Sequence, residues 1–181
     1  MTVKRIFDLL LSIMIMMLLA PFILIVLIYY LISKDIIFKQ TRVGKHGKLF
    51  MIYKLKTMNN GEVTTVGKWL RKYKVDELPQ LFNILIGDMS FVGPRPDIPG
   101  YYDQLTGNDR QILKLKPGLT SPAAIKYRDE DRILALQSDP INFNDAVLFP
   151  DKIRMNLEYL EKQSLYYDLR IIIKTIFSFL K

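Results

Sequence analysis

The chain has 181 residues, with 26 Lys and Arg against 18 Asp and Glu, so its formal net charge is +8 and its pI is near 9.5. Half of the residues are hydrophobic and 24% are charged, which excludes a disordered chain. With no cysteine and a single histidine, His46, the sequence excludes disulfides, thiol catalysis, and Cys-rich or His-rich metal sites. A bound metal would need oxygen ligands, which favours Mg²⁺, Mn²⁺ or Ca²⁺.

An uncharged apolar stretch runs from Leu9 to Ile32. Its roughly 24 residues could just cross a hydrocarbon layer of about 30 Å as a helix, so one interpretation is a transmembrane helix. Lys and Arg flank the stretch on both sides, and Pro21 near its middle disrupts helical hydrogen bonding. A helix that enters the membrane, bends at Ala20–Pro21 and leaves by the same face is the other interpretation. The residues alone leave both open.

Sequence patterns after residue 34 predict mainly helices with one small β-hairpin, an α+β fold. Two β-leaning runs flank the turn-like Val43–Gly47, and their two-residue period places Lys54 and Lys56 on one face. Prolines exclude a regular helix over residues 90–99. Helical spacing predicts helices over residues 66–73, 78–86, 151–163 and 168–181, with one or two helical turns at 109–115.

Two of these helices have the composition of helices that lie at a membrane interface. Trp69 and Tyr73 of the first lie beside Lys and Arg, and the last carries a thin basic stripe on a wide apolar surface. A solvated helix face for the first, and packing into the core for the last, are alternatives that the pattern leaves open. The stripe consists of Arg170, Lys174, Ser178 and Lys181.

An adjacent acidic pair, Asp76 and Glu77, is followed by Pro79. Proline suits a first helical turn, so the pair is predicted at a helix start, where acidic residues commonly cap the helix and favour its dipole. A functional interpretation is also open because three cations, Arg71, Lys72 and Lys74, precede the pair, and a helix start beside cations accepts phosphate. A carboxylate in such a site can bind Mg²⁺ together with a diphosphate, or attack phosphorus.

A second candidate group is Arg95, which stands between Pro94 and Pro96. The fixed φ angles of the two prolines hold the arginine backbone stiffly, which suits a guanidinium aimed at a phosphate. An incidental arginine in a surface turn is the alternative. Lys54 and Lys56 are further phosphate-contact candidates, with ordinary solvated lysines as the alternative.

The chain closely resembles the bacterial sugar transferase family, the monotopic phosphoglycosyl transferases, in the strings DELPQLFNILIGDMSFVGPRP, IFKQTRVGKHGKLFMIYKLKTM and KPGLT. The resemblance runs from about Lys4 to the C-terminus, and its motifs are long and specific. It implies the minimal form of the family, with no appended module. It divides the chain into a re-entrant membrane helix hairpin (residues 1–34) and a cytoplasmic, membrane-associated catalytic domain (residues 35–181).

The resemblance also implies a reaction, the transfer of a phospho-sugar from a UDP-sugar to polyprenyl (undecaprenyl) phosphate with release of UMP. This is a first membrane step of bacterial surface glycan biosynthesis. Asp76 would be the nucleophile that forms a covalent phospho-sugar intermediate, and Glu77 would hold Mg²⁺, with Mn²⁺ as an alternative. Lys54, Arg71 and Arg95 would contact phosphates.

The same resemblance implies a location and a set of partners. The re-entrant helix would keep both chain ends on the cytoplasmic face of the inner membrane. The expected partners are the UDP-sugar donor, polyprenyl phosphate, membrane lipids and downstream glycosyltransferases, without nucleic acid.

Three departures from the family pattern bear on these expectations. Ala20 replaces the usual serine before Pro21, which removes a hydroxyl that could satisfy a carbonyl freed by the bend. The segment Ser121–Arg128 differs from the usual continuation after PGLT and leaves the donor sugar open. Asn156 stands where aspartate is common, whereas Asp168 matches a late acidic position and is a further site candidate.

Two other function classes are alternatives to the enzyme. A non-catalytic membrane scaffold for a glycan assembly complex would keep the basic face, but the intact Asp76, Glu77 and Arg95 argue against it. A membrane-tethered nucleic-acid binder rests only on the +8 charge, which attraction to a membrane surface explains equally well.

Overall fold

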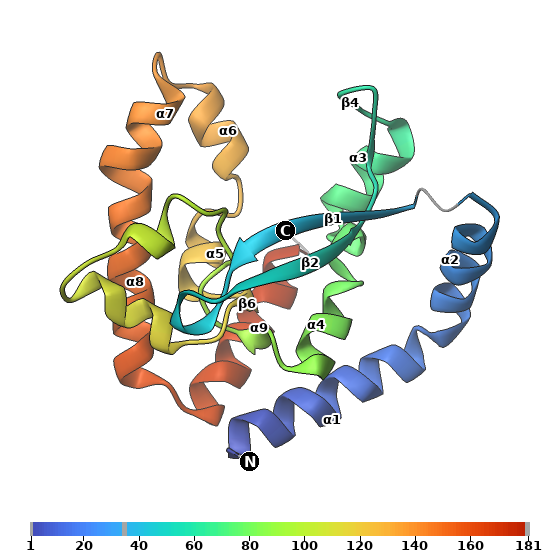
Figure 1. The fold of residues 1–181 in the computed structure, drawn as a ribbon, viewed down its shortest axis with the longest axis horizontal. Helices are drawn as coiled ribbons and strands as arrows, with labels where there is room; N and C mark the ends of the chain where they lie inside the picture. Colours follow the sequence, from blue (N-terminus) through green and yellow to red (C-terminus); the bar gives the residue numbers. More distant parts are fainter. Residues whose placement is uncertain (1, 34–35, 180–181) are drawn as a thin grey trace. The chain divides into compact units, whose positions relative to one another are not determined.

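The computed structural model describes residues 2–33 and 36–179. The described chain is mainly helical, with three two-stranded sheets (Figure 1). It packs as two compact units. The first unit comprises Met1–Arg42 and Leu49–Met89, and the second comprises Val43–Lys48 and Ser90–Lys181. The domain boundary predicted after residue 34, and Lys181 of the predicted basic stripe, lie outside the described residues.

The apolar N-terminal stretch forms two helices, α1 (Val3–Leu18) and α2 (Ala20–Ser33), which turn at Leu19 (Figure 1). The interruption lies one residue before the predicted Ala20–Pro21. Pro21 therefore occupies the first turn of α2, where its missing N–H costs no hydrogen bond. The Leu19 N–H points to the carbonyls of Ile15 and Met17, and the latter is the carbonyl that Pro21 leaves without its helical donor. The break thus needs no serine hydroxyl at position 20.

Within residues 2–33 and 36–179, none of the helices combines the length and the apolar character needed to span a bilayer.

The predicted hairpin is confirmed: β1 (Ile37–Val43) pairs with β2 (Leu49–Leu55) around the short 3₁₀ turn η1 (Lys45–Gly47). His46 takes a left-handed backbone conformation at this tip, with φ of 60°. A second, shorter ribbon follows, in which β3 (Met58–Asn59) pairs antiparallel with β4 (Glu62–Val63). Their two-residue strands carry too little pattern to be predicted.

Three helical segments complete the first unit. The predicted helices are confirmed as α3 (Thr65–Lys72) and α4 (Gln80–Ile86), the second ending at Gly87 in the left-handed conformation that suits a C-terminal glycine. Between them lies η2 (Val75–Glu77), a 3₁₀ turn that contains the acidic pair.

The second unit contains a parallel strand pair that the sequence pattern did not predict. β5 (Ser90–Val92) pairs with β6 (Gly118–Thr120). A Cβ on Gly93 would lie 2.1 Å from the carbonyl oxygen of Lys116, and one on Gly118 would lie 2.2 Å from the Gly93 nitrogen. Only residues without side chains allow this approach, so the glycines of the GPRP and PGLT motifs join two distant segments by backbone contact.

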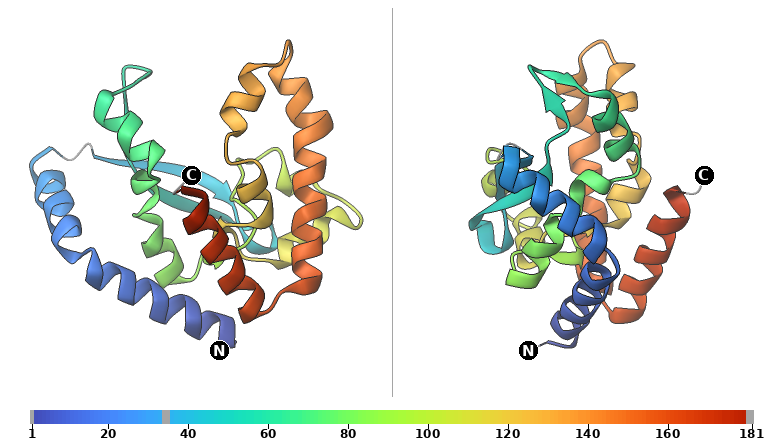
Figure 2. Two further views of the ribbon diagram at one scale, coloured as in Figure 1. Left: turned by 180° about the vertical axis from the view of Figure 1, so that it is seen from behind. Right: turned by 90° about the vertical axis from the view of Figure 1, so that its right-hand side faces the viewer.

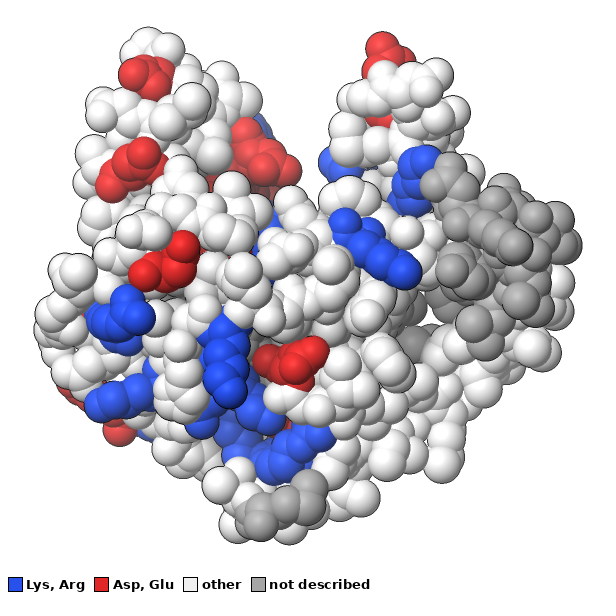
Figure 3. Space-filling view, in the orientation of Figure 1, with Lys and Arg blue, Asp and Glu red and all other residues white. Residues whose placement is uncertain are grey.

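The remaining elements of the second unit are helical and surround a core of Val43, Tyr102, Ile112, Leu113 and Ile153. The predictions over 109–115, 151–163 and 168–181 are confirmed within the described residues. The short segments are η3 (Tyr102–Gln104), η4 (Asp109–Lys114), α5 (Pro122–Lys126), α6 (Glu130–Ala135), α7 (Pro140–Phe143) and the π-helical η5 (Asn144–Leu148). The long helices are α8 (Phe149–Lys162) and α9 (Leu165–Phe179). Figure 3 shows acidic side chains on the lobe formed by α6 and α7.

Candidate active site

The acidic pair sits in its own turn rather than on the first turn of α4. Lys74 adopts a left-handed conformation, with φ of 55°, and this turns the chain from α3 into η2. Pro79 occupies the N-cap position of α4, and neither η2 nor α4 has a side-chain hydrogen bond at its N-cap. The pair thus lies in a first helical turn, as predicted, but that turn belongs to η2 and not to α4. A strained, non-glycine residue beside a buried acidic pair is a common feature of functional sites.

Lys54 and Glu77 form an ion pair that joins the hairpin to η2. The Lys54 Nζ lies 3.3 Å from Glu77 Oε1, and both side chains are largely buried, with 19% and 11% of their surfaces exposed. Partial burial strengthens such a pair relative to one in water. The predicted phosphate-contact lysine thus lies within reach of the acidic pair, and Lys56, two residues further, is exposed.

Asp76 is buried without a full set of hydrogen bonds. Its surface is 7% exposed, and its Oδ1 atom finds no hydrogen-bond partner among the described residues. Burial raises the pKa of Asp76 above its ordinary value, and the neighbouring Glu77 charge raises it further, whereas Lys54 and Lys74 oppose the rise. A buried carboxylate oxygen that lacks a donor destabilises the fold, which is typical of a group retained for chemistry.

Arg71 is positioned by the loop that precedes β3. Its Nε donates a hydrogen bond of 2.8 Å to Oγ1 of Thr57, a residue that is itself buried. The Thr57 backbone also packs closely against α3. A Cβ on Gly67 would lie 2.1 Å from the Thr57 carbonyl oxygen, so only glycine fits at this contact. The arginine side chain is otherwise exposed, as expected of a guanidinium that contacts a substrate phosphate.

The other two predicted site residues belong to the second unit. Arg95 is exposed and follows β5, between two buried prolines. Asp168 lies on α9, is 1% exposed, and accepts a hydrogen bond of 2.5 Å from the Tyr159 hydroxyl of α8. That bond holds two helices together. The first unit therefore gathers Asp76, Glu77, Lys54 and Arg71, while a substrate role for Arg95 or Asp168 stays a prediction.

The donor atoms of the acidic pair fit a hard divalent cation only in part. Asp76 offers an unpartnered carboxylate oxygen, and Glu77 offers a second carboxylate. In the part of the chain that the structure describes, three or more acidic or histidine side chains do not gather into a metal cluster. Mg²⁺ commonly binds through one or two carboxylates plus substrate phosphates and water, so the pair suits a cation that arrives with a diphosphate.

Sequence reasoning missed two residues that shape this site, Thr57 and Arg5, and it named Lys74 only as a nearby cation. Thr57 positions Arg71, and Lys74 both turns the backbone and opposes the raised pKa of Asp76. Arg5, in the first turn of α1, contacts α4 from far away in the sequence. In the sequence, Arg5 is only a positive charge beside the apolar stretch, and the preference of Lys and Arg for one side of a membrane accounts for such a charge.

Comparison with known proteins identifies the class. The family model described as bacterial sugar transferase matches residues 1–181, so the chain belongs to the bacterial sugar transferase family.

Individual relatives differ in length and in how fully they are described. The chain is 32% identical over 190 residues to "Uncharacterized sugar transferase EpsL" of Bacillus subtilis, with 97% of this chain and 86% of that protein covered. It is 30% identical to "Undecaprenyl-phosphate galactose phosphotransferase" of Salmonella typhimurium, with 95% and 39% covered. It is 31% identical to "UDP-glucose:undecaprenyl-phosphate glucose-1-phosphate transferase" of Escherichia coli, with 97% and 39% covered. The chain thus spans about two fifths of the length of these last two relatives.

Proposed function

We propose that this protein transfers a phospho-sugar from a UDP-sugar to undecaprenyl or another polyprenyl phosphate, with release of UMP, through a covalent intermediate on Asp76. The observation that carries the proposal is the buried Asp76, with an unpartnered carboxylate oxygen beside the Lys54–Glu77 ion pair. The relatives named for undecaprenyl-phosphate galactose and glucose phosphotransfer supply the substrate class.

The reaction has two displacements at one phosphorus atom. A carboxylate oxygen of Asp76 attacks the phosphorus that carries the sugar, the bond from that phosphorus to the bridging oxygen breaks, and UMP leaves. An oxygen of polyprenyl phosphate then attacks the same phosphorus, which regenerates the carboxylate and forms a polyprenyl diphospho-sugar. Burial and the raised pKa make the ionised Asp76 a stronger nucleophile than a solvated aspartate.

The cations around the acidic pair address the main obstacle, the repulsion between a carboxylate and a diphosphate. Lys54 forms an ion pair with Glu77, and Arg71 of helix α3 donates a hydrogen bond to Thr57. Both can neutralise phosphate charge as a negatively charged nucleophile approaches. Mg²⁺ held by Glu77 and Asp76 would supply further neutralisation of the charge on the donor's diphosphate. For Arg95, a phosphate contact remains a prediction of the family resemblance.

The apolar surfaces support association with the inner membrane through a re-entrant α1–α2 pair. Large hydrophobic side chains of these helices are exposed, and Leu18 at the end of α1 is 80% exposed. Helix α3 presents Trp69 and Tyr73 beside lysines and arginines, and α9 presents Ile173 and Phe177 beside its own basic residues. Such faces suit helices that lie at a lipid surface, close to a polyprenyl phosphate head group.

UMP release tests this function directly. Purified protein in nanodiscs would receive Mg²⁺, polyprenyl phosphate and a panel of UDP-sugars. We expect UMP release that needs both the lipid phosphate and one donor. A well-folded protein that releases no UMP across a broad panel, and forms no sugar adduct, would instead support the scaffold alternative.

A further inference from the structure

Helix α1 carries a polar stripe that is at odds with its apolar sequence. Arg5, Asp8 and Ser12 are spaced by three and four residues, so they share one face of the helix. Asp8 and Ser12 are 2% and 0% exposed, although most of the large apolar side chains of α1 are exposed. The helix thus turns its polar face toward protein and leaves its apolar face uncovered.

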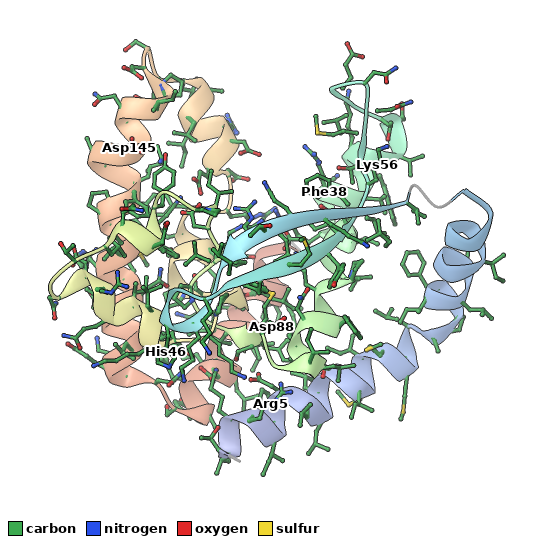
Figure 4. All side chains as sticks on the ribbon, in the orientation of Figure 1. Arg5, Phe38, His46, Lys56, Asp88 and Asp145 are labelled. Atoms are coloured by element: carbon green, nitrogen blue, oxygen red, sulfur yellow. The ribbon has the colours of Figure 1, made fainter. Side chains whose placement is uncertain are left out.

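The protein surface that receives this face is α4, against which α1 lies (Figure 2). The Arg5 guanidinium donates to two successive carbonyls at the end of α4: Nη1 to Ile84, and Nη2 to Leu85 at 2.6 Å. Figure 4 shows Arg5 on α1 beside this helix. Carbonyls in the last turn of a helix lack i+4 helical donors and carry partial negative charge, which a guanidinium offsets. The Ile84 carbonyl also accepts from the Gly87 N–H at 3.1 Å.

Helix α4 is also the support of the candidate active site. It begins three residues after Glu77, and its Asn83 Nδ2 donates a 2.7 Å hydrogen bond to the Met51 carbonyl of β2. β2 is the strand that carries Lys54. One seven-residue helix therefore fixes both partners of the Lys54–Glu77 ion pair, and Arg5 holds the far end of that helix.

We infer that Arg5 is a positioning residue for Asp76 and Glu77, acting through α4, so that the seating of the apolar helix α1 sets the geometry of the acidic pair. The inference rests on the proposed function for the catalytic meaning of that geometry. The contact itself is independent of the reaction. Arginine suits this place because lysine, a single point charge, cannot serve two carbonyls in a fixed fork.

Three variants of the full chain in nanodiscs separate the contact from the charge. Arg5→Lys keeps the positive charge but loses the two-pronged contact. Arg5→Gln loses both. Lys39→Gln is the matched control, because it removes one exposed positive charge from the opposite flank of the apolar stretch and leaves α4 untouched.

The kinetic readout is the turnover number against the KM for the UDP-sugar. We expect both Arg5 variants to lower kcat about tenfold, the usual scale for a slightly misplaced reacting group, with KM within about twofold of wild type. Lys39→Gln should retain wild-type kcat. Equal losses in Arg5→Gln and Lys39→Gln, with normal turnover in Arg5→Lys, would show that only charge matters and would overturn the inference.

Hydrogen exchange provides a readout that does not depend on activity. We expect faster amide exchange in residues 75–89 of Arg5→Lys, with residues 90–179 and the Lys39→Gln protein unchanged. Unchanged exchange in residues 75–89 would overturn the inference, and so would a uniform rise across the chain, which marks a general loss of folding. If wild-type protein releases no UMP but Arg5→Lys shows faster exchange in residues 75–89, the proposed function fails while the link from Arg5 to the acidic pair stands.

Discussion

Two buried aspartates, one in each unit of the chain, differ in how their carboxylates are satisfied. Asp168 accepts a hydrogen bond from the Tyr159 hydroxyl, and the bond joins α8 to α9. Asp76 has a comparable degree of burial, but its Oδ1 lacks a partner among the described residues. Burial alone therefore does not distinguish the two. Their hydrogen bonds do distinguish them, since the Asp168 carboxylate joins two helices and the Asp76 carboxylate has an oxygen without a donor among the described residues.

This difference matches the surroundings of each residue. Asp76 lies in a 3₁₀ turn that follows a strained Lys74 and is flanked by Lys54 and Glu77. Asp168 lies in the first turn of a regular 15-residue helix. Irregular backbone around an unsatisfied acid is expected where stability has been given up for chemistry. The comparison predicts opposite consequences when each carboxylate is altered.

The largest expected effect is the loss of turnover in Asp76→Asn. The amide cannot act as a carboxylate nucleophile, so we expect kcat to fall by more than about a thousandfold with nanodisc incorporation unchanged. UMP release measures the loss. Asp88→Asn, in the same unit, is the matched control and should remain active. Appreciable turnover by pure Asp76→Asn protein would remove Asp76 from the role of nucleophile.

The next largest effect concerns the backbone contact that supports Arg95. Gly93→Ala places a Cβ 2.1 Å from the Lys116 carbonyl oxygen, which we expect to destabilise the fold by about 3 kcal/mol. Gly61→Ala is the comparison, because nothing lies within 4 Å of its Cβ and only its positive φ opposes the substitution, at about 1 kcal/mol. Thermal unfolding of the two variants compares these costs. Equal losses would show that the β5–β6 approach tolerates a side chain.

A smaller effect tests whether Asp168 is structural. Tyr159→Phe removes the hydroxyl that donates to Asp168, and we expect it to lower the free energy of unfolding by about 1 to 2 kcal/mol. Because the bond lies between α8 and α9, turnover per folded molecule should stay within about twofold of wild type. A large loss of kcat in a variant of normal stability would instead place Asp168 in the chemistry.

The smallest effect is a gain in stability. The pKa of Asp76 is raised in the folded protein, so folding favours its protonated form and opposes its ionised form. Below the ordinary pKa of aspartate, Asp76 is protonated in both the folded and the unfolded protein, so it does not lower the free energy of unfolding. As pH rises through the pKa of Asp76 in the folded protein, ionisation lowers the free energy of unfolding. Asp76→Asn lacks this ionisation, so it should match wild type in acid and unfold at a higher temperature at neutral pH. A variant that is less stable than wild type at pH 7 would contradict the raised pKa.

Most helices and the hairpin could be predicted because their periodic patterns are long enough to identify. The strand pair β5–β6 could not, since strands of three residues are too short to show a period. The separate η2 turn was missed because Pro79 suits the start of a helix equally well. Local patterns also predicted no helix over residues 130–148, where short helices and a π-helical turn follow one another.

The candidate site was predictable to a different extent. The acidic pair and its nearby cations stood out in the sequence, and the resemblance gave each residue a role. The contacts that hold them could not be read from the sequence, because Arg5 and Leu85 of α4 are 80 residues apart and Asn83 and Met51 are 32 apart. Tertiary contacts of this kind leave no local pattern.

The most direct test of the account is to trap the covalent intermediate. Wild-type protein would be incubated with Mg²⁺ and its UDP-sugar donor in the absence of polyprenyl phosphate, then digested and analysed by mass spectrometry. We predict that the peptide containing Asp76 gains the mass of one phospho-sugar, that UMP is released in equal amount, and that added polyprenyl phosphate removes the adduct. Turnover without any adduct, or an adduct on another residue, would contradict the proposal that Asp76 is the nucleophile.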